Sequence, residues 1–377
     1  MGQNKMKVAI VCDWLTNVGG AEKVLLAVHK LYPKAPIYTS QYSPKGIDWF
    51  LDADVRTGWL RIFPARLRRF LGPLRQRWFS HLDLSEYDLV ISVTGAEAKA
   101  VRVPNGVHVC YCHVPTQYYW QMYDEYVSKP GFGILNPLVR LCFKLLVKPL
   151  RKADFKAASR VDQFVTISEY AKDLIAKYYK REAIVVHPPV EVSDFKSVKG
   201  TNEASDYYIV TSRQVTWKRL DLAVKACLKL KRPLVVVGEG PEHNNLVKMA
   251  GGSELIKFVP LVGKKELAKY LAGASAYLFP SMEPFGIAPV EALAAGCPVI
   301  AFGEGGALDY VEDGKNGVLF EKQTVNSLAE AINRFEKMKF NSAQISRTAD
   351  KFEVKRFDDE MREVVKEVLD GKDKKDV

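Results

Sequence analysis

The stretch Leu278–Phe302, LFPSMEPFGIAPVEALAAGCPVIAF, constrains the fold of this chain more than any other. The apolar run Ala276–Phe279 that leads into it predicts a buried parallel strand, and Pro298–Phe302 predicts the next one. Between them, Pro280–Gly286 has the composition of a loop, and an alanine-rich helix is expected to begin near Pro289. This order of strand, loop, helix and strand is the repeating unit of an open α/β sheet.

The same stretch predicts a ligand site. Ligands of open α/β sheets bind outside the carboxyl ends of the strands, and the free N–H groups at the start of the next helix favour a phosphate. Glu283 lies in the loop and Glu291 about a turn into the helix, so two carboxylates flank this site. Beside a phosphate they are useful only if they bind hydroxyl groups, such as those of a ribose and a hexose. The alternative is an ordinary strand–helix unit with solvent-exposed glutamates.

The segment EPFGIAPVEALAAGCPVIA, which begins at Glu283, resembles the E-x₇-E signature of retaining family-4 glycosyltransferases with the GT-B fold. Gly305–Val311 (GGALDYV), Gly314 and Asn316-Gly317 continue that pattern. The resemblance implies an α/β protein of two Rossmann-like domains that face each other across a cleft. Within the family, the chain most resembles bacterial polysaccharide and lipid-linked mannosyltransferases.

The domain boundaries follow from composition and from this resemblance. Val190–Ser205 is polar and irregular, which predicts the interdomain linker. We therefore expect an acceptor-side domain at residues 1–190 and a nucleotide-sugar-binding domain at 200–351. The resemblance implies that a C-terminal helix at 352–377 packs back on the first domain.

The resemblance also implies roles for individual residues of the donor site. Arg213 and Lys218 are two cations in a loop that opens a helix, and they would stabilise the departing diphosphate. Glu283 would bind the donor hexose, Glu291 the ribose, and His113 would position the sugar. The other expected donor-binding residues are Gly19, Gly20, Gly238, Pro260, Phe285, Gly286 and Ile287.

Gly19 and Gly20 follow the first predicted strand, but the sequence around them lacks the G-x-G-x-x-G spacing of an NAD site. On the acceptor side we expect Asp13, Lys99 and Tyr118, the last in an aromatic loop that could face a sugar ring. For Asp13 the alternative is a plain strand-end cap.

Two motifs invite a metal site. Asp52-Ala53-Asp54 has the D-x-D form of metal-dependent glycosyltransferases of another fold, but nothing after it resembles that fold. Cys110-Tyr111-Cys112-His113 places two thiols on one face of a predicted buried strand, and no second Cys/His cluster completes a set of four ligands. We expect core thiols, no metal and no cofactor other than the nucleotide-sugar substrate.

The excess positive charge lies in the first half of the chain. Residues 1–160 contain 23 Lys and Arg against 12 Asp and Glu, whereas the rest contains 32 of each. Arg56–Phe79 has seven arginines among aromatic and leucine residues and no acid, and Leu135–Arg160 is a second basic amphipathic stretch. Such segments favour an anionic membrane surface. The expected membrane-binding residues are Arg61, Arg66, Arg68, Arg69, Arg75 and Arg77.

A solvated basic face is the alternative to membrane binding, and nucleic acid is not expected because no nucleic-acid-binding motif accompanies the charge. Six scattered cysteines in mostly apolar runs favour reduced thiols. Without a signal peptide or an apolar run of about 18 residues, we expect a cytoplasmic protein held peripherally at the inner face of the plasma membrane.

The predicted function is retaining, metal-independent transfer of a hexosyl group to a lipid-linked or polysaccharide acceptor hydroxyl. The preferred donor is GDP-mannose. The alternatives are a UDP-sugar-dependent glycosyltransferase, a nucleotide-sugar epimerase of the same fold, and a non-catalytic nucleotide-sugar-binding protein.

Overall fold

The computed structural model describes residues 6–64, 71–128, 133, 136–196 and 207–373. By its internal contacts the chain divides into two compact units, and each is described on its own. The first unit contains Met1–Pro188 and Asp358–Val377, and the second contains Pro189–Phe357. The predicted basic residues Arg66, Arg68 and Arg69 lie outside the described residues.

Helix α13 (Val354–Asp373) contains the point at which the chain leaves the second unit, at Phe357, and re-enters the first, at Asp358. Phe352, where the sequence places the start of this return, packs its ring on Phe285 and Tyr310 of the second unit. The described beginning of the expected linker is not irregular throughout, because it forms helix α6 (Val192–Lys196).

The described part of the first unit is built on a seven-stranded parallel sheet in the order β3-β2-β1-β4-β5-β6-β7. Its central strands are buried along their whole length, as the continuous apolar runs of a sheet covered on both faces require. Within this sheet Val8 pairs with Leu89 and Cys12 with Val93. The strands are β1 (Val8–Cys12), β2 (Ile37–Thr39), β3 (Val55–Thr57), β4 (Leu89–Thr94), β5 (Val107–Cys112), β6 (Gln163–Thr166) and β7 (Ala183–Val185).

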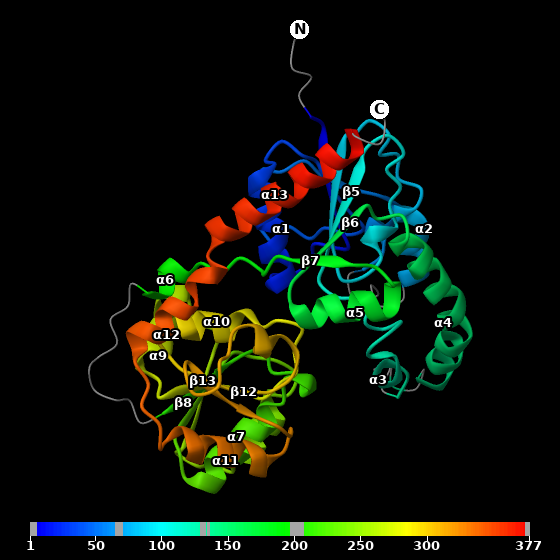
Figure 1. The fold of residues 1–377 in the computed structure, drawn as a ribbon. Coiled ribbons are helices and arrows are strands. Elements are labelled where there is room, and N and C mark those ends of the chain that lie inside the picture. Colours follow the sequence, from blue (N-terminus) through cyan, green and yellow to red (C-terminus); the bar gives the residue numbers. More distant parts are fainter. Residues whose placement is uncertain (1–5, 65–70, 129–132, 134–135, 197–206, 374–377) are drawn as a thin grey trace. The chain divides into compact units, whose positions relative to one another are not determined.

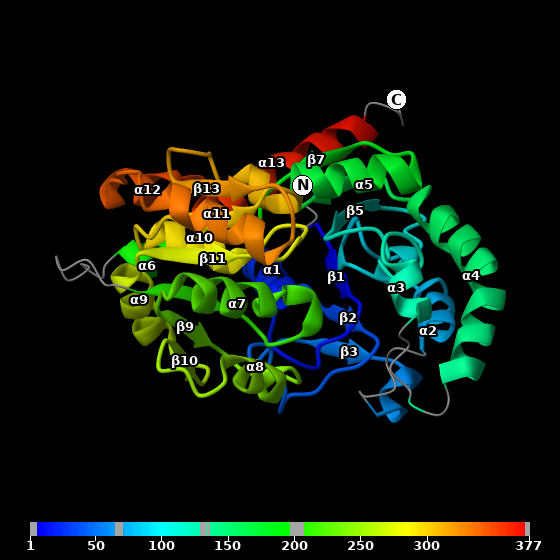
Figure 2. The same cartoon turned by 90° about the horizontal axis from the view of Figure 1, so that it is seen from below.

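Helices connect these strands and cover the sheet (Figures 1 and 2). Helix α5 begins after Ser168, whose hydroxyl accepts a hydrogen bond from the Ala171 N–H, as predicted for an N-cap. The long helix α4 packs against α2, α3 and α5 and follows the outer edge of the unit in Figure 2. The helices are α1 (Gly20–Leu31), α2 (Gly72–Phe79), α3 (Tyr123–Ser128), α4 (Asn136–Ala158) and α5 (Glu169–Tyr179).

Among its described residues, the second unit has a six-stranded parallel sheet in the order β10-β9-β8-β11-β12-β13. Figure 1 shows α7 and α11 on one face and α9, α10 and α12 on the other. The strands are β8 (Tyr208–Thr211), β9 (Leu234–Val237), β10 (Ile256–Val259), β11 (Ala276–Phe279), β12 (Val299–Phe302) and β13 (Gly317–Phe320). The helices are α7 (Leu220–Leu230), α8 (His243–Ala250), α9 (Lys264–Gly273), α10 (Ile287–Ala294), α11 (Val325–Phe335) and α12 (Ser342–Thr348).

Each sheet has one point where the strand order reverses. In the first unit the chain builds outward from β1 to β3 and then returns to β4 beside β1. In the second it builds from β8 to β10 and returns to β11 beside β8. Loops leave such a pair of strands in opposite directions and open a crevice at their carboxyl ends. The candidate sites therefore lie after β1 and β4 and after β8 and β11.

Candidate active site

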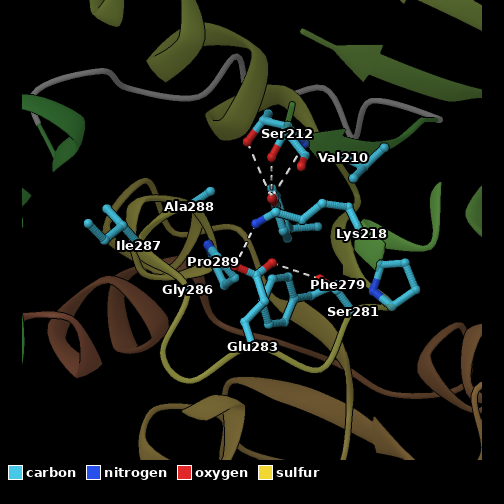
Figure 3. Close-up of a pocket in the computed structure, with 13 residues that line it drawn as sticks. Val210, Ser212, Lys218, Phe279, Ser281, Glu283, Gly286, Ile287, Ala288 and Pro289 are labelled. Atoms are coloured by element: carbon cyan, nitrogen blue, oxygen red, sulfur yellow. Dashed lines mark hydrogen bonds and ion pairs between the residues drawn. The ribbon is translucent and has the colours of Figure 1, made fainter. Parts of the chain in front are cut away.

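A pocket occupies the reversal point of the second unit (Figure 3). Strand β8 and the residue after it contribute Thr211 and Ser212, and β11 contributes Tyr277 and Phe279. The first turn of α10, Ile287–Pro289, lines the pocket. Backbone N–H groups at a helix start, here those of Ile287 and Ala288, lack partners within the helix and favour an anion. The pocket expected from the opening stretch therefore forms within one unit, from residues that sequence alone places tens of positions apart.

Lys218 and Glu283 meet in this pocket. The Lys218 Nζ lies 2.5 Å from Glu283 Oε2, and the Ser281 hydroxyl donates to Glu283 Oε1 at 2.7 Å (Figure 3). Both charged side chains are mostly buried, at 19% and 12% exposed. The pair keeps a cation and an anion beside the helix N-terminus with their charges compensated. A bound diphosphate could form an ion pair with the Lys218 ammonium, and a sugar hydroxyl could donate a hydrogen bond to the Glu283 carboxylate.

The loop that carries Glu283 packs against the glycine pair Gly305-Gly306. The Gly306 N–H donates to the Glu283 carbonyl at 2.8 Å, and the Tyr310 hydroxyl donates to the Phe285 carbonyl at 2.8 Å. Gly286 has φ +98°, and a Cβ there would lie 2.7 Å from the Phe279 ring, so only glycine fits. This positive φ turns the chain into α10 two residues before the position expected from Pro289, which instead occupies the first helical turn.

Gly306→Ala should damage the site without touching a ligand. A Cβ at this position would lie 2.4 Å from both the Phe285 Cα and the Pro284 carbonyl oxygen, so the loop must move. A displacement of about 1 Å in a catalytic group costs roughly 10²-fold in rate. We expect a loss of that order in the turnover of the substrate that this pocket binds, measured by steady-state kinetics. Gly303→Ala is the matched control, because its Cβ would meet nothing closer than 3.4 Å, and equal activity of the two variants would contradict this role for Gly306.

The remaining donor-site residues of the second unit are placed as follows. Glu291 lies on the second turn of α10 and is 8% exposed, and it is not a solvent-facing glutamate. Burial, and after it the carboxylates of Glu283 and Glu291, raise the pKa of Tyr277. Arg213 is exposed and is not among the residues that line the pocket, and Pro260 is exposed after β10. Arg219 is paired with Asp221 at 3.1 Å.

Gln214 is a site-supporting residue that the sequence analysis missed. It is fully buried, its side chain donates to the Gly238 carbonyl, and its Oε1 lies 2.9 Å from His243 Nδ1. Gly238 has φ +118°, and a Cβ there would lie 2.3 Å from the Ser212 carbonyl. The two loops that follow β8 and β9 are thereby fastened together. An uncharged glutamine in the loop between Arg213 and Lys218 carries no pattern that would predict this contact.

At the reversal point of the first unit, the Asp13 carboxylate binds the loop after β4. Its Oδ1 accepts from the Ala98 N–H at 2.8 Å, and its Oδ2 accepts from the N–H groups of Gly95 and Ala96 at 2.9 and 3.0 Å. The Thr94 hydroxyl lies 2.9 Å from both oxygens. Burial, and then the nearby Glu97 carboxylate, raise the pKa of Asp13. Asp13 therefore supports the loop after β4, and its acceptor role stays a prediction.

The burial of Lys99 and Arg75 does not fit the exposed roles predicted for them. Lys99 is 1% exposed and its ammonium lies 2.7 Å from Asp154, so it does not face an acceptor. Burial alone lowers the pKa of Lys99, but Asp154 together with Tyr179 and Cys112 outweighs burial and holds that pKa well above the usual value. Arg75, expected at a membrane, is 1% exposed, donates to Glu97 at 2.8 Å and lies over the Trp14 ring. It lies on the face of α2 that packs inward.

Tyr118 is half-buried, and its hydroxyl donates to Glu97 and lies 3.3 Å from Arg75. His113 follows β5, its N–H donates to the Thr94 carbonyl, and burial lowers the pKa of its ring to about 4, so the ring is neutral at pH 7. Gly19 and Gly20 lie in the first unit at the N-terminus of α1. Arg61 and Arg77 are exposed.

The residues of the two candidate metal motifs lie as follows. Asp54 accepts a forked pair of bonds from Arg56 at 2.7 and 3.0 Å, and Cys110 and Cys112 are buried in β5. Across the residues that the structure describes, no three or more His, Cys, Asp or Glu side chains are grouped as a metal site would require.

Comparison with known proteins points to the same unit. Residues 191–352 match the family model described as Glycosyl transferases group 1. D-inositol 3-phosphate glycosyltransferase from Streptomyces avermitilis is 28% identical over 226 residues, which are 52% of this chain and 49% of that protein. The GtfA subunit of the UDP-N-acetylglucosamine–peptide N-acetylglucosaminyltransferase from Streptococcus pneumoniae is 28% identical over 239 residues, 57% of this chain and 47% of that protein. The chain thus spans about half the length of these curated relatives.

Among solved structures, HepE from Anabaena in complex with UDP aligns with 96% of this chain and 100% of its own chain, with a TM-score of 0.71 and 18% identity. This likeness confirms the predicted α/β fold of two Rossmann-like domains of the GT-B kind. The matched residues include Lys218, Glu283 and Glu291, so the pocket of Figure 3 lies within the part of the chain that is similar to this family.

Proposed function

We propose that this protein transfers a hexosyl group, with retention of configuration, from a nucleotide-diphosphate sugar to an acceptor hydroxyl. The observation that carries the proposal is the Lys218–Glu283 pair at the N-terminus of α10, inside the reversal-point pocket. A cation and free N–H groups suit a diphosphate, and a carboxylate beside them suits sugar hydroxyls. The group 1 family match over residues 191–352 supports the same activity.

The chemistry asked of this site is stabilisation of a leaving group. The bond between the sugar C1 and the distal phosphate oxygen breaks, and its electron pair leaves with the diphosphate. The acceptor oxygen bonds to C1 on the same face, and its proton passes to the departing phosphate. Lys218 and the amides of Gly286 and Ile287 would stabilise the developing charge, with Arg213 as a second cation. Glu283 would hold the hexose and Glu291 the ribose. No metal is assigned to the reaction.

Two donors compete in this proposal. The resemblance of the sequence to bacterial mannosyltransferases favours GDP-mannose. The names of the relatives favour a UDP-linked sugar, because HepE was crystallised with UDP and with UDP-glucose, and GtfA belongs to a UDP-N-acetylglucosamine transferase. We keep GDP-mannose as the first candidate and UDP-hexose as the second.

The acceptor we propose is a lipid-linked or polysaccharide hydroxyl, used by a protein attached peripherally to the inner face of the plasma membrane. The support is the basic first half of the chain, including the exposed Arg61 and Arg77. His113, neutral at pH 7, would position the sugar as a hydrogen-bonding group without charge.

A donor screen with one variant tests the proposal. The protein is incubated with GDP- and UDP-sugars, and release of nucleotide diphosphate is followed by mass spectrometry. Glu291→Ala should weaken binding of the bare nucleotide diphosphate by calorimetry, because a charged hydrogen bond of about 1.5–3 kcal/mol to the ribose is lost. Turnover of GDP-mannose alone, or of a UDP-sugar alone, decides the donor. Turnover of none, with nucleotide binding intact, would favour a binding protein, and interconversion of the sugar would favour an epimerase.

A further inference from the structure

Helix α4 exposes an apolar face on the first unit. Leu138, Leu141, Leu145 and Leu146 are 59%, 56%, 69% and 47% exposed, and Cys142 between them is exposed as well. These positions recur at three and four residues, so they form one continuous stripe along the helix. Isolated exposed leucines are ordinary on protein surfaces, but five neighbouring apolar side chains on one stripe are not.

The opposite face of α4 packs against the rest of the unit, as the apolar face of an amphipathic helix usually does. Val147, Asp154, Ala157 and Ala158 are buried, and α4 packs against α2, α3 and α5. The exposed stripe is therefore a second apolar face, which packing within the unit does not require.

The charged side chains beside this stripe indicate what kind of surface it binds. Lys144, Lys148, Lys152 and Lys156 are exposed on the same helix. The only acid within α4 is Asp154, and it is buried against Lys99. A second copy of this chain would bring the same positive charges face to face, which opposes self-association. Lysine flanks with an apolar centre suit an anionic lipid surface, where the leucines enter the acyl boundary and the ammonium groups reach the phosphates.

We propose that the exposed stripe Leu138, Leu141, Cys142, Leu145 and Leu146 of α4 is an interfacial helix face that inserts into an anionic lipid bilayer. The proposal rests on the proposed function only in that both place the first unit at a membrane. Insertion is shallow, because no described helix has the length and apolar content to cross a bilayer.

This assignment places the main apolar contact on α4 rather than on the arginine-rich stretch Arg56–Phe79. In that stretch Leu60, Leu71, Phe79 and Arg75 are buried, and the exposed apolar side chains Trp59, Ile62 and Leu74 do not extend over successive helical turns. Arg61 and Arg77 remain exposed and can add charge, but the described large apolar side chains in a continuous exposed stripe are those of α4.

The test is co-sedimentation of the full chain with vesicles of phosphatidylcholine, with and without phosphatidylglycerol. Leu141→Asp/Leu145→Asp should weaken binding to the anionic vesicles by about tenfold or more, because buried apolar area and attraction for phosphate are both lost. Leu51→Asp is the matched control, since Leu51 is 63% exposed in the same unit and lies outside the stripe. Thermal unfolding of both variants should match that of the wild type, because the replaced side chains are exposed.

Cys142 gives a direct readout of position. It is exposed, whereas the other five cysteines are buried, so a thiol-reactive, environment-sensitive dye attaches there selectively. We expect its emission to shift to the blue on anionic vesicles. Binding without a shift would place the contact on another surface and overturn the proposal, as would equal binding by the double aspartate variant. A dimer that the double variant converts to monomer would assign the stripe to self-association instead.

The two proposals fail separately. Nucleotide binding by calorimetry uses the second unit and should be unchanged in Leu141→Asp/Leu145→Asp. Loss of vesicle binding with intact nucleotide binding bears on the role of α4 alone. Loss of nucleotide binding with intact vesicle binding bears on the proposed transfer reaction alone.

Discussion

Lys218→Ala should lower turnover by about 10²–10³-fold, the usual cost of removing one group aimed at charge that develops in the transition state. The Lys218 ammonium reaches into the pocket to within 2.5 Å of Glu283, and the first turn of α10 lines the same pocket. A departing diphosphate gains negative charge as the sugar bond breaks, so the contribution of Lys218 grows along the reaction. The loss should appear in kcat more than in the affinity for the donor sugar.

The measurement is steady-state kinetics with the donor identified by the screen. Lys225→Ala is the matched control, because Lys225 is exposed on α7 of the same unit and does not line the pocket. Arg213→Ala should also depress turnover, but less, since Arg213 is exposed and outside the lining. A chelator should leave the wild-type rate intact under the metal-independent proposal. If Lys218→Ala raised KM with kcat unchanged, Lys218 would serve ground-state binding only.

Apolar runs predicted the sheets well. β11 begins at Ala276 and ends at Phe279, as the apolar run predicts, because a strand buried on both faces must be apolar throughout and is bounded by turn residues. The bounds of β10 are harder to predict, because the apolar residues continue to Leu261, which is 81% exposed in the loop that follows the strand. The edge strand β3 was not predicted, since its three half-exposed residues carry no period.

The loop and the helix start of the pocket could be predicted because they are adjacent in the sequence. Glu283, Gly286 and Ile287 lie in one loop and one helix start, and the reversal of strand order brings β8 beside β11. The buried ion pairs between residues that are far apart in the sequence could not be predicted. In the sequence, Arg75 is one of seven arginines between Arg56 and Phe79 and nothing distinguishes it from the others. Only the packing of α2 shows that it pairs with Glu97. Burial of a charge depends on a partner far along the chain, which no local pattern contains.

The first unit therefore uses its reversal point differently from the second. After β1 and β4, Asp13 binds the backbone of residues 95–98, and the same loop sends Glu97 to Arg75 and Lys99 to Asp154. These contacts lie in the interior rather than in a cavity. We infer that they hold the shape of the loop on which any acceptor contact of this unit would depend.

Asp154→Ala should be the most destabilising of the changes considered. The Asp154 carboxylate accepts from Lys99 at 2.7 Å, Thr116 at 3.0 Å, the Trp120 indole at 2.7 Å and the Tyr179 hydroxyl at 2.8 Å, and it is fully buried. Its removal leaves the Lys99 ammonium buried without its anion. Breaking a buried ion pair in this way costs about 3–5 kcal/mol in the free energy of unfolding. Urea unfolding followed by tryptophan fluorescence measures it, because five of the six tryptophans lie in residues 1–188.

The double variant Lys99→Met/Asp154→Leu separates the charge from the packing. It replaces both partners by apolar side chains, so no buried charge is left uncompensated, and such replacements are often close to neutral. We expect it to recover most of the stability that Asp154→Ala loses, whereas Lys99→Met alone, which strands the carboxylate, should not. A midpoint for the double variant as low as that of Asp154→Ala would mean that the hydrogen bonds to Trp120 and Tyr179, rather than the ion pair, stabilise this part of the unit.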